Sequence, residues 1–168
     1  PESIRLAAHQ GYSLLLDQIL SFDQFKEKIE FYQYEIEKLG KIFDPYSIGV
    51  TRGLMFAENS KEREEAHGVR NQFISRVKSL SSGNNSQSAT FNPVGLVSNE
   101  VEMSEYGAII GDKKEMIQRV EKLYQSGVRN ILLHDLTGST AALKEFALEV
   151  VPKFLAYPNA DKQATHHL

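Results

Sequence analysis

Residues 106–134 read YGAIIGDKKEMIQRVEKLYQSGVRNILLH, and this stretch decides the fold. Asp112 and Glu115 have the spacing of a capping box, so we predict a helix from there to about Ser126, just before a glycine. The apolar run Asn130–His134 then predicts a buried strand. An amphipathic helix followed by a nearly continuous apolar strand is typical of a parallel sheet with covered faces.

Helices and apolar runs alternate over the rest of the chain as well. Upstream, the periodicity predicts helices over 3–10, 21–39 and 61–77 and strands over 12–16 and 46–57. Downstream, a last helix begins at Thr140, with a buried side made of Leu143, Phe146, Val150 and Val151. This order of elements predicts an α/β fold built on a parallel sheet.

The predicted sheet is too small to close on itself. A (β/α)8 barrel takes roughly 250 residues, and a three-stranded parallel sheet leaves two bare edges. We therefore expect the C-terminal part, about three βα units, of a TIM (β/α)8 barrel, completed by a preceding segment or a partner chain. The start at Pro1, without an initiator Met, also indicates a fragment or a processed chain. A complete, small α/β sandwich is the alternative fold.

Composition limits the function classes. The 168 residues are 41% hydrophobic and 24% charged, which predicts a soluble globular chain. The net charge of −3 gives no electrostatic case for nucleic acid or an anionic membrane. No cysteine is present, so disulfides and thiolate nucleophiles are excluded, and a cytoplasmic location is the expectation. No apolar run approaches the roughly 18 residues that a transmembrane helix needs.

A long insertion follows the second predicted strand. Residues 58–110 leave that strand at its carboxyl end, where barrel active sites lie. Within the insertion, residues 81–92 contain little apolar material and predict a mobile loop. We expect 58–110 to form a lid, with a surface excursion or an oligomer contact as the alternatives. The partial barrel then spans 1–154, and residues 155–168 form a polar tail.

Several segments resemble the bacterial luciferase-like flavin monooxygenases. Tyr106–Asp112 matches the family's glycine before a helix, and Ser126–Leu133 matches its Ala-Gly-Val-like turn into an apolar strand. Phe146–Phe154 is similar to the family's closing helix, and Pro1–Leu16 resembles its Ser-Pro-Glu-Ser phosphate loop and the helix after it. The resemblance extends to about Phe154 and implies the last three of the family's eight strands.

This resemblance implies a flavin-dependent monooxygenase that oxidises a small organic substrate with reduced flavin and O2. FMN is the implied cofactor, and a deazaflavin is the alternative because relatives include deazaflavin-dependent dehydrogenases and reductases. The implied partners are the small-molecule substrate, a flavin reductase, and either a second copy of the chain or the missing N-terminal half.

The chain alone is expected to be inactive, since the early residues that bind the flavin ring in the family are absent. Two other readings stay open. One is a non-catalytic, subunit-like or truncated barrel fragment that binds no flavin, and the other is an unrelated barrel with a phosphate site.

Ser3 and Glu2 are the candidate phosphate-binding residues. A serine at a helix N-terminus offers its hydroxyl beside free backbone N–H groups, and the helix dipole favours an anion there. The resemblance places this loop against the flavin phosphate, with Ser3 at a contact position. Glu2 flanks Ser3, and its own charge does not favour an anion. The alternative is that Ser3 only caps the helix.

Asp17 and Gln18 follow the first predicted strand at its carboxyl end. The resemblance implies polar contacts to the edge of the flavin ring near this point. An amide such as that of Gln18 can both donate to and accept from the alternating N–H and C=O groups of the ring. A solvated loop is the alternative.

Three further polar residues belong to predicted strands. His134 and Asp135 end the last strand, where a histidine can act as an acid or base near neutral pH or have a structural role. Arg52 lies in Val50–Gly53, which also fits the resemblance, and its charge needs a partner in a structural ion pair or at a pocket.

The remaining histidines give no site. His67 is expected to be solvated, and His166 and His167 give only a weak metal signal, so we assign no metal site. No catalytic residue is assigned either.

Overall fold

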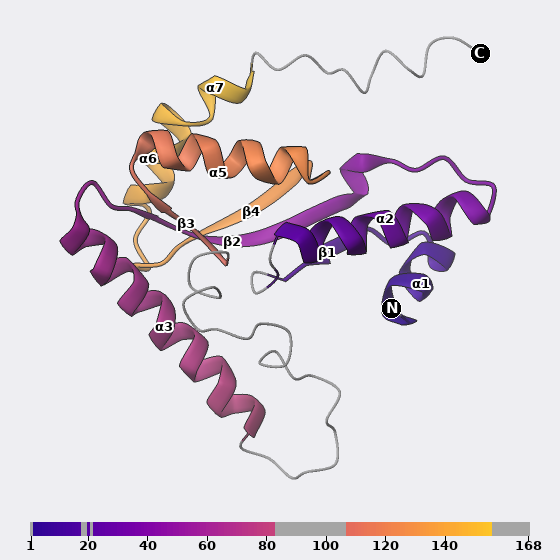
Figure 1. Ribbon diagram of the computed structural model, residues 1–168, viewed down its shortest axis with the longest axis horizontal. Coiled ribbons are helices and arrows are strands. Elements are labelled where there is room, and N and C mark those ends of the chain that lie inside the picture. Colours follow the sequence, from indigo (N-terminus) through magenta and orange to yellow (C-terminus); the bar gives the residue numbers. More distant parts are fainter. Residues whose placement is uncertain (1, 18–19, 21, 83–106, 156–168) are drawn as a thin grey trace.

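The computed structural model describes residues 2–17, 20, 22–82 and 107–155. The elements in chain order are α1 (Glu2–Gln10), β1 (Leu14–Leu16), α2 (Phe22–Lys38), the 3-10 helix η1 (Pro45–Ser47), β2 (Ile48–Phe56), α3 (Ser60–Ser82), β3 (Ala108–Gly111), α5 (Lys113–Gln125), β4 (Asn130–Asp135), α6 (Ala141–Glu149) and α7 (Pro152–Leu155). Figure 1 shows the helices arranged around one sheet. The expected α/β fold with a parallel sheet is confirmed.

Strand β2 is the centre of the sheet, and each of its pairings is parallel. It pairs with β1 along residues 48–50, with β4 along 49–54 and with β3 along 53–56. A strand has only two edges, and β4 occupies one of them along most of β2. The short strands β1 and β3 therefore share the other edge, one after the other.

The main hydrophobic core lies between the sheet and the helices α1, α2, α5 and α6. Leu54 of β2 and Ile109 of β3 are fully buried in it, and Phe25 of α2 and Met116 of α5 pack against this face. Successive residues of a strand point to opposite faces, so Met55 and Ile110 face the other way. They form a second cluster with Ala66 of α3. Figure 1 accordingly shows α3 and α5 on opposite sides of the sheet.

Helix α3 covers only the carboxyl-terminal part of this second face. Nearer the amino-terminal end, Leu15 is 62% exposed and Leu132 is 59% exposed. Their partners in the register, Gly49 and Thr51, lie on the same face. We call the face at these four positions the bare sheet face; Leu15 and Leu132 are its exposed residues, whereas Gly49 is buried beside them.

The local signals of α5 were predicted correctly. Asp112 accepts a hydrogen bond from the backbone N–H of Glu115 at 2.9 Å, and the Glu115 carboxylate accepts one from the Asp112 N–H at 2.9 Å. Both halves of the capping box are therefore present. The predicted buried side of the last helix is correct for Phe146 and Val150, but Val151, in the turn between α6 and α7, is 36% exposed.

Other boundaries differ from the prediction. Strand β3 was not predicted as a strand, and it is only four residues long. Helix α3 continues to Ser82, so Ser81 and Ser82 of the predicted mobile loop are helical. The rest of that loop and the tail from residue 156 lie outside the described residues. Within the described part of the chain, no helix is long and apolar enough to cross a membrane.

Candidate functional site

Four polar side chains from β1, β2, α3 and β4 lie near one another at the carboxyl end of the sheet. Asp17 directly follows β1, Arg52 lies in β2 and His134 in β4, and α3 adds Arg70. Electrostatic interactions join Arg70 to each of the other three. We call this set the carboxyl-end cluster. Since ligands of parallel barrels bind at this end, it is the candidate functional site.

Arg52 is the most enclosed member of the cluster, with 1% of its surface exposed. Its Nη1 donates to the carbonyl oxygens of Thr51 at 2.6 Å and Asp17 at 3.3 Å, and its Nη2 donates to that of Leu20 at 3.4 Å. The guanidinium also lies over the Phe25 ring, 4.2 Å from its centroid. Of the two predicted roles, the structure supports the structural one, with backbone carbonyls in place of an ion pair.

Burial lowers the pKa of Arg52 to about 9, and the neighbouring Arg70 charge acts in the same direction, while Asp17 raises it. Arg70 is also fully buried, and burial lowers its pKa to about 10 against the opposite effect of Asp17. Both groups stay charged at pH 7, because arginine holds its proton very firmly. Asp17 is exposed, and its carboxylate reduces the repulsion between the two buried cations.

His134 lies on the face that α3 covers. It pairs in register with Gly53, and its ring centroid is 6.3 Å from that of Phe73 of α3. Burial lowers the pKa of His134, and the Arg70 charge adds to this, while Asp135 raises it. The imidazole is therefore neutral at pH 7 and can accept a proton or a hydrogen bond.

Asp135 has a structural role. Its carboxylate accepts hydrogen bonds from the Thr137 N–H at 2.7 Å and the Ala142 N–H at 3.1 Å, at the first turn of α6. Burial raises its pKa, but the hydrogen bonds from Thr137, Ala142 and Ser139 together outweigh that effect, so the pKa is lowered. The side chain thus holds the turn between β4 and α6 and stabilises the start of that helix.

Gly53 allows a close approach at the same end of the sheet. A Cβ atom at this position would lie 2.5 Å from Cδ2 of Leu136. Leu136 packs with Met55 against the small second cluster under α3. The glycine therefore lets the chain leaving β4 fold down tightly over β2.

Ser3 and Glu2 lie in the first turn of α1, and both are exposed. The helix begins at Glu2, so Ser3 is inside the first turn rather than the predicted cap position before it. Only the short segment 11–13 separates α1 from β1, and the contacts of Arg5 and His9 with Glu35 set α1 against α2. Gln18, the fourth predicted contact residue, lies outside the described residues.

Arg5, one turn along α1, is engaged elsewhere. Its Nε lies 3.4 Å from Oε1 of Glu35, which is 98% buried in α2. His9 Nε2 lies 3.6 Å from the other carboxylate oxygen, Oε2. Glu35 therefore holds α1 against α2. Because Arg5 is engaged by Glu35, Ser3 is the group of this turn best suited to bind an anion.

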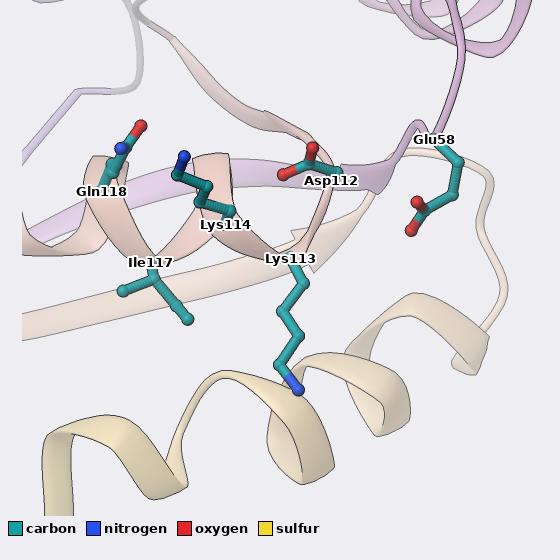
Figure 2. A pocket seen from close by; sticks show the side chains of 6 residues that line it. All are labelled: Glu58, Asp112, Lys113, Lys114, Ile117 and Gln118. Atoms are coloured by element: carbon teal, nitrogen blue, oxygen red, sulfur yellow. The ribbon is translucent and has the colours of Figure 1, made fainter.

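A second candidate is a pocket of about 420 Å³ at the start of α5, and no residue of the carboxyl-end cluster is among its described lining residues. Figure 2 shows its six lining residues, which are Glu58, Asp112, Lys113, Lys114, Ile117 and Gln118. Lys113 reaches Glu149 of α6, and Asp112 is occupied by the capping box. Two of its four charged side chains therefore have partners within the protein, and none of the predicted site residues is among those that line it.

Sequence reasoning missed Arg70 and Phe73, because the charged helix predicted over 61–77 was not assigned a buried face. The signal was present, since Ala66, Arg70 and Phe73 recur at helical spacing on one face. His67 is partly buried instead of fully solvated, and His166 and His167 lie outside the described residues. Among the residues that the structure describes, no group of three or more His, Asp or Glu side chains is placed to hold a metal ion.

Solved structures of flavin-type enzymes share this fold. Monooxygenase RslO1 from Streptomyces bottropensis matches with a TM-score of 0.63 and 19% identity, over 92% of this chain and 45% of its own. The oxygenating constituent of 3,6-diketocamphane monooxygenase from Pseudomonas putida, solved with FMN, matches with a TM-score of 0.54 and 16% identity, over 90% and 45%. Coenzyme F420-dependent tetrahydromethanopterin reductase from Methanopyrus kandleri matches with a TM-score of 0.59 and 16% identity, over 90% and 48%.

At these identities the likeness shows the fold alone. No protein-family model matches the sequence, and no curated protein matches it. The chain spans less than half the length of the solved structures it resembles. The expected α/β fold of a partial TIM barrel is therefore confirmed.

Proposed function

We propose that this chain is part of a luciferase-like flavin-dependent monooxygenase that oxidises a small organic substrate with reduced FMN and O2. The observation that supports it most is the match over 92% of the chain to a monooxygenase. An FMN-bound monooxygenase and a long-chain alkane monooxygenase have the same fold. A deazaflavin is the second candidate cofactor, because two F420-dependent enzymes are equally similar.

Ser3, Glu2, Asp17 and Gln18 are the proposed cofactor contacts. The described residues fit a flavin in part. Ser3 is exposed in a first helical turn that favours a phosphate, whereas the Glu2 carboxylate, 4.0 Å from Arg5, would repel one. Asp17 is exposed beside two buried cations at the carboxyl edge. A bound flavin would supply the oxygen chemistry, and these residues would orient it.

The proposal includes a partner for the bare sheet face. Leu15 and Leu132 are large apolar side chains exposed on one face of the sheet, on the strands β1 and β4 that flank β2. We propose that an N-terminal half or a second copy of the chain covers them, with completion by the N-terminal half favoured because the neighbours are about twice as long. A flavin reductase and a cytoplasmic location remain part of the proposal.

FMN and F420 titrated separately into the purified chain test the proposal. We expect quenching of flavin fluorescence with FMN, weakened about tenfold by Ser3→Ala or Asp17→Asn, since each removes a polar contact. Ser75→Ala, which changes an exposed serine of α3, is the matched control. Binding of F420 alone would move the assignment to the deazaflavin enzymes. Binding of neither cofactor, with the fold intact by circular dichroism, would favour a non-catalytic barrel subunit.

A further inference from the structure

The two short strands leave a gap along their shared edge of β2. The β1 ladder ends where Leu16 meets Val50, and the β3 ladder begins where Ala108 meets Gly53. The two β2 residues between them, Thr51 and Arg52, belong to neither ladder. Backbone groups in such a gap need other partners, because buried carbonyls are costly to leave without hydrogen bonds.

The side chain of Arg52 provides one such partner, because its guanidinium donates to the Thr51 carbonyl at 2.6 Å. Its three hydrogen bonds join the β2 backbone at Thr51 to both ends of the segment that leaves β1, at Asp17 and at Leu20. Phe25 of α2 lies under the guanidinium plane and limits its movement. One rigid, planar group is therefore tied to a strand, the following loop and the next helix.

We propose that Arg52 is a positioning residue that fixes Asp17 at the carboxyl edge of the sheet. It holds the Asp17 backbone by a hydrogen bond and attracts the Asp17 carboxylate by charge. Any effect of Arg52 on flavin binding rests on the proposed function, in which Asp17 contacts the flavin. The positioning of Asp17 is independent of that function, since it follows from contacts within the chain.

Lysine cannot replace Arg52 in this role. A guanidinium presents its donors in a fixed planar fork and stacks on an aromatic ring, whereas an ammonium is a compact, strongly hydrated point charge. Arg52→Lys keeps the charge beside Asp17 but loses the simultaneous bonds to separate carbonyls. Arg52→Met keeps most of the side-chain volume but loses both the charge and the hydrogen bonds.

Arg129 provides a matched control at the opposite end of the sheet. Its guanidinium lies 4.1 Å from the Tyr124 ring centroid, and its Nη1 donates to the carbonyl oxygens of Tyr124 at 3.0 Å and Val128 at 3.2 Å. Arg129→Met therefore removes a similar stacked arginine without touching the segment after β1.

The decisive measurement is amide hydrogen exchange at Asp17 and Leu20. Arg52 bonds the carbonyl oxygens of these residues and not their N–H groups, so the measurement reports how easily the segment opens locally. We expect exchange about 10- to 100-fold faster in Arg52→Met, which loses the charge-assisted hydrogen bonds that hold the segment, and no change in Arg129→Met. Arg52→Lys should give an intermediate increase, and it serves as the test if Arg52→Met does not fold. Unchanged exchange in a folded Arg52 variant, or an equal increase in Arg129→Met, would overturn the inference.

Cofactor titration of the same variants separates the two proposals. If the wild-type chain binds FMN, we expect Arg52→Lys to weaken binding about tenfold or more, because small misplacements of binding groups are costly. If the wild-type chain binds no flavin, the proposed function fails while the exchange result still decides the role of Arg52. Weaker FMN binding without faster exchange would contradict positioning.

Discussion

Gly111→Ala should destabilise the protein at the junction of β3 and α5. Gly111 has φ +150°, a conformation that side chains rarely adopt, and a Cβ there would lie 2.5 Å from Oε2 and 2.8 Å from Cβ of Glu115. The backbone strain costs about 1–3 kcal/mol and disruption of the capping box about 1 kcal/mol, so we expect a total loss of about 2–4 kcal/mol.

Urea unfolding followed by circular dichroism measures this loss. With a slope of about 2 kcal/mol per molar urea, the middle of the usual range, the midpoint should fall by about 1–2 M. Gly68→Ala is the control, since Gly68 lies inside α3 with no atom within 4 Å of a built Cβ. It should stabilise the helix by about 0.5–1 kcal/mol. A Gly111→Ala midpoint within about 0.3 M of the wild type would refute the reasoning.

Three further changes test the contacts that hold the elements together. The Arg63 hydrogen bond to Glu115, at 2.7 Å, lowers the pKa of that carboxyl. The contribution of this bond to the free energy of unfolding is therefore present at neutral pH and is lost as the pH falls through the folded-state pKa. Glu115→Gln should therefore flatten the acid side of the stability profile, measured by urea midpoints from pH 7 to 3. Asp135→Ala should cost about 1–2 kcal/mol and increase hydrogen exchange at the start of α6, because it removes a helix cap. Tyr32→Phe should lower the free energy of unfolding by about 1 kcal/mol, because it removes a 2.9 Å hydrogen bond to the Tyr12 carbonyl.

The sequence predicted well those features that depend only on residues close together in the chain. The capping box of Asp112 and Glu115 needs only a local spacing, and α5 begins where that spacing predicts. The buried positions Phe25 and Ile29 of α2 likewise follow from helical periodicity. The partial barrel could be inferred because it depends on the order of elements and not on their exact ends.

Features set by distant residues were missed. Ala108–Gly111 is too short to show a strand pattern, and it is a strand because it pairs with β2. The position of Arg52 in an apolar strand predicts that it is buried. Its partners could not be predicted, because Asp17 and Leu20 are 35 and 32 residues away in the sequence. The role of Arg70 depends in the same way on the packing of α3 against the sheet.

The pairing of β2 also has a consequence for synthesis of the chain on the ribosome. Gly49 pairs with Asn130, so one edge of β2 stays unpaired until 81 further residues, the difference between those two positions, have been made. At about 5–20 residues per second, this takes about 4–16 s. During that interval Ile48, Val50 and Leu54, all fully buried in the folded chain, can meet other apolar surfaces. Association of the nascent chain with other apolar surfaces is therefore expected to be greatest before β4 has been made.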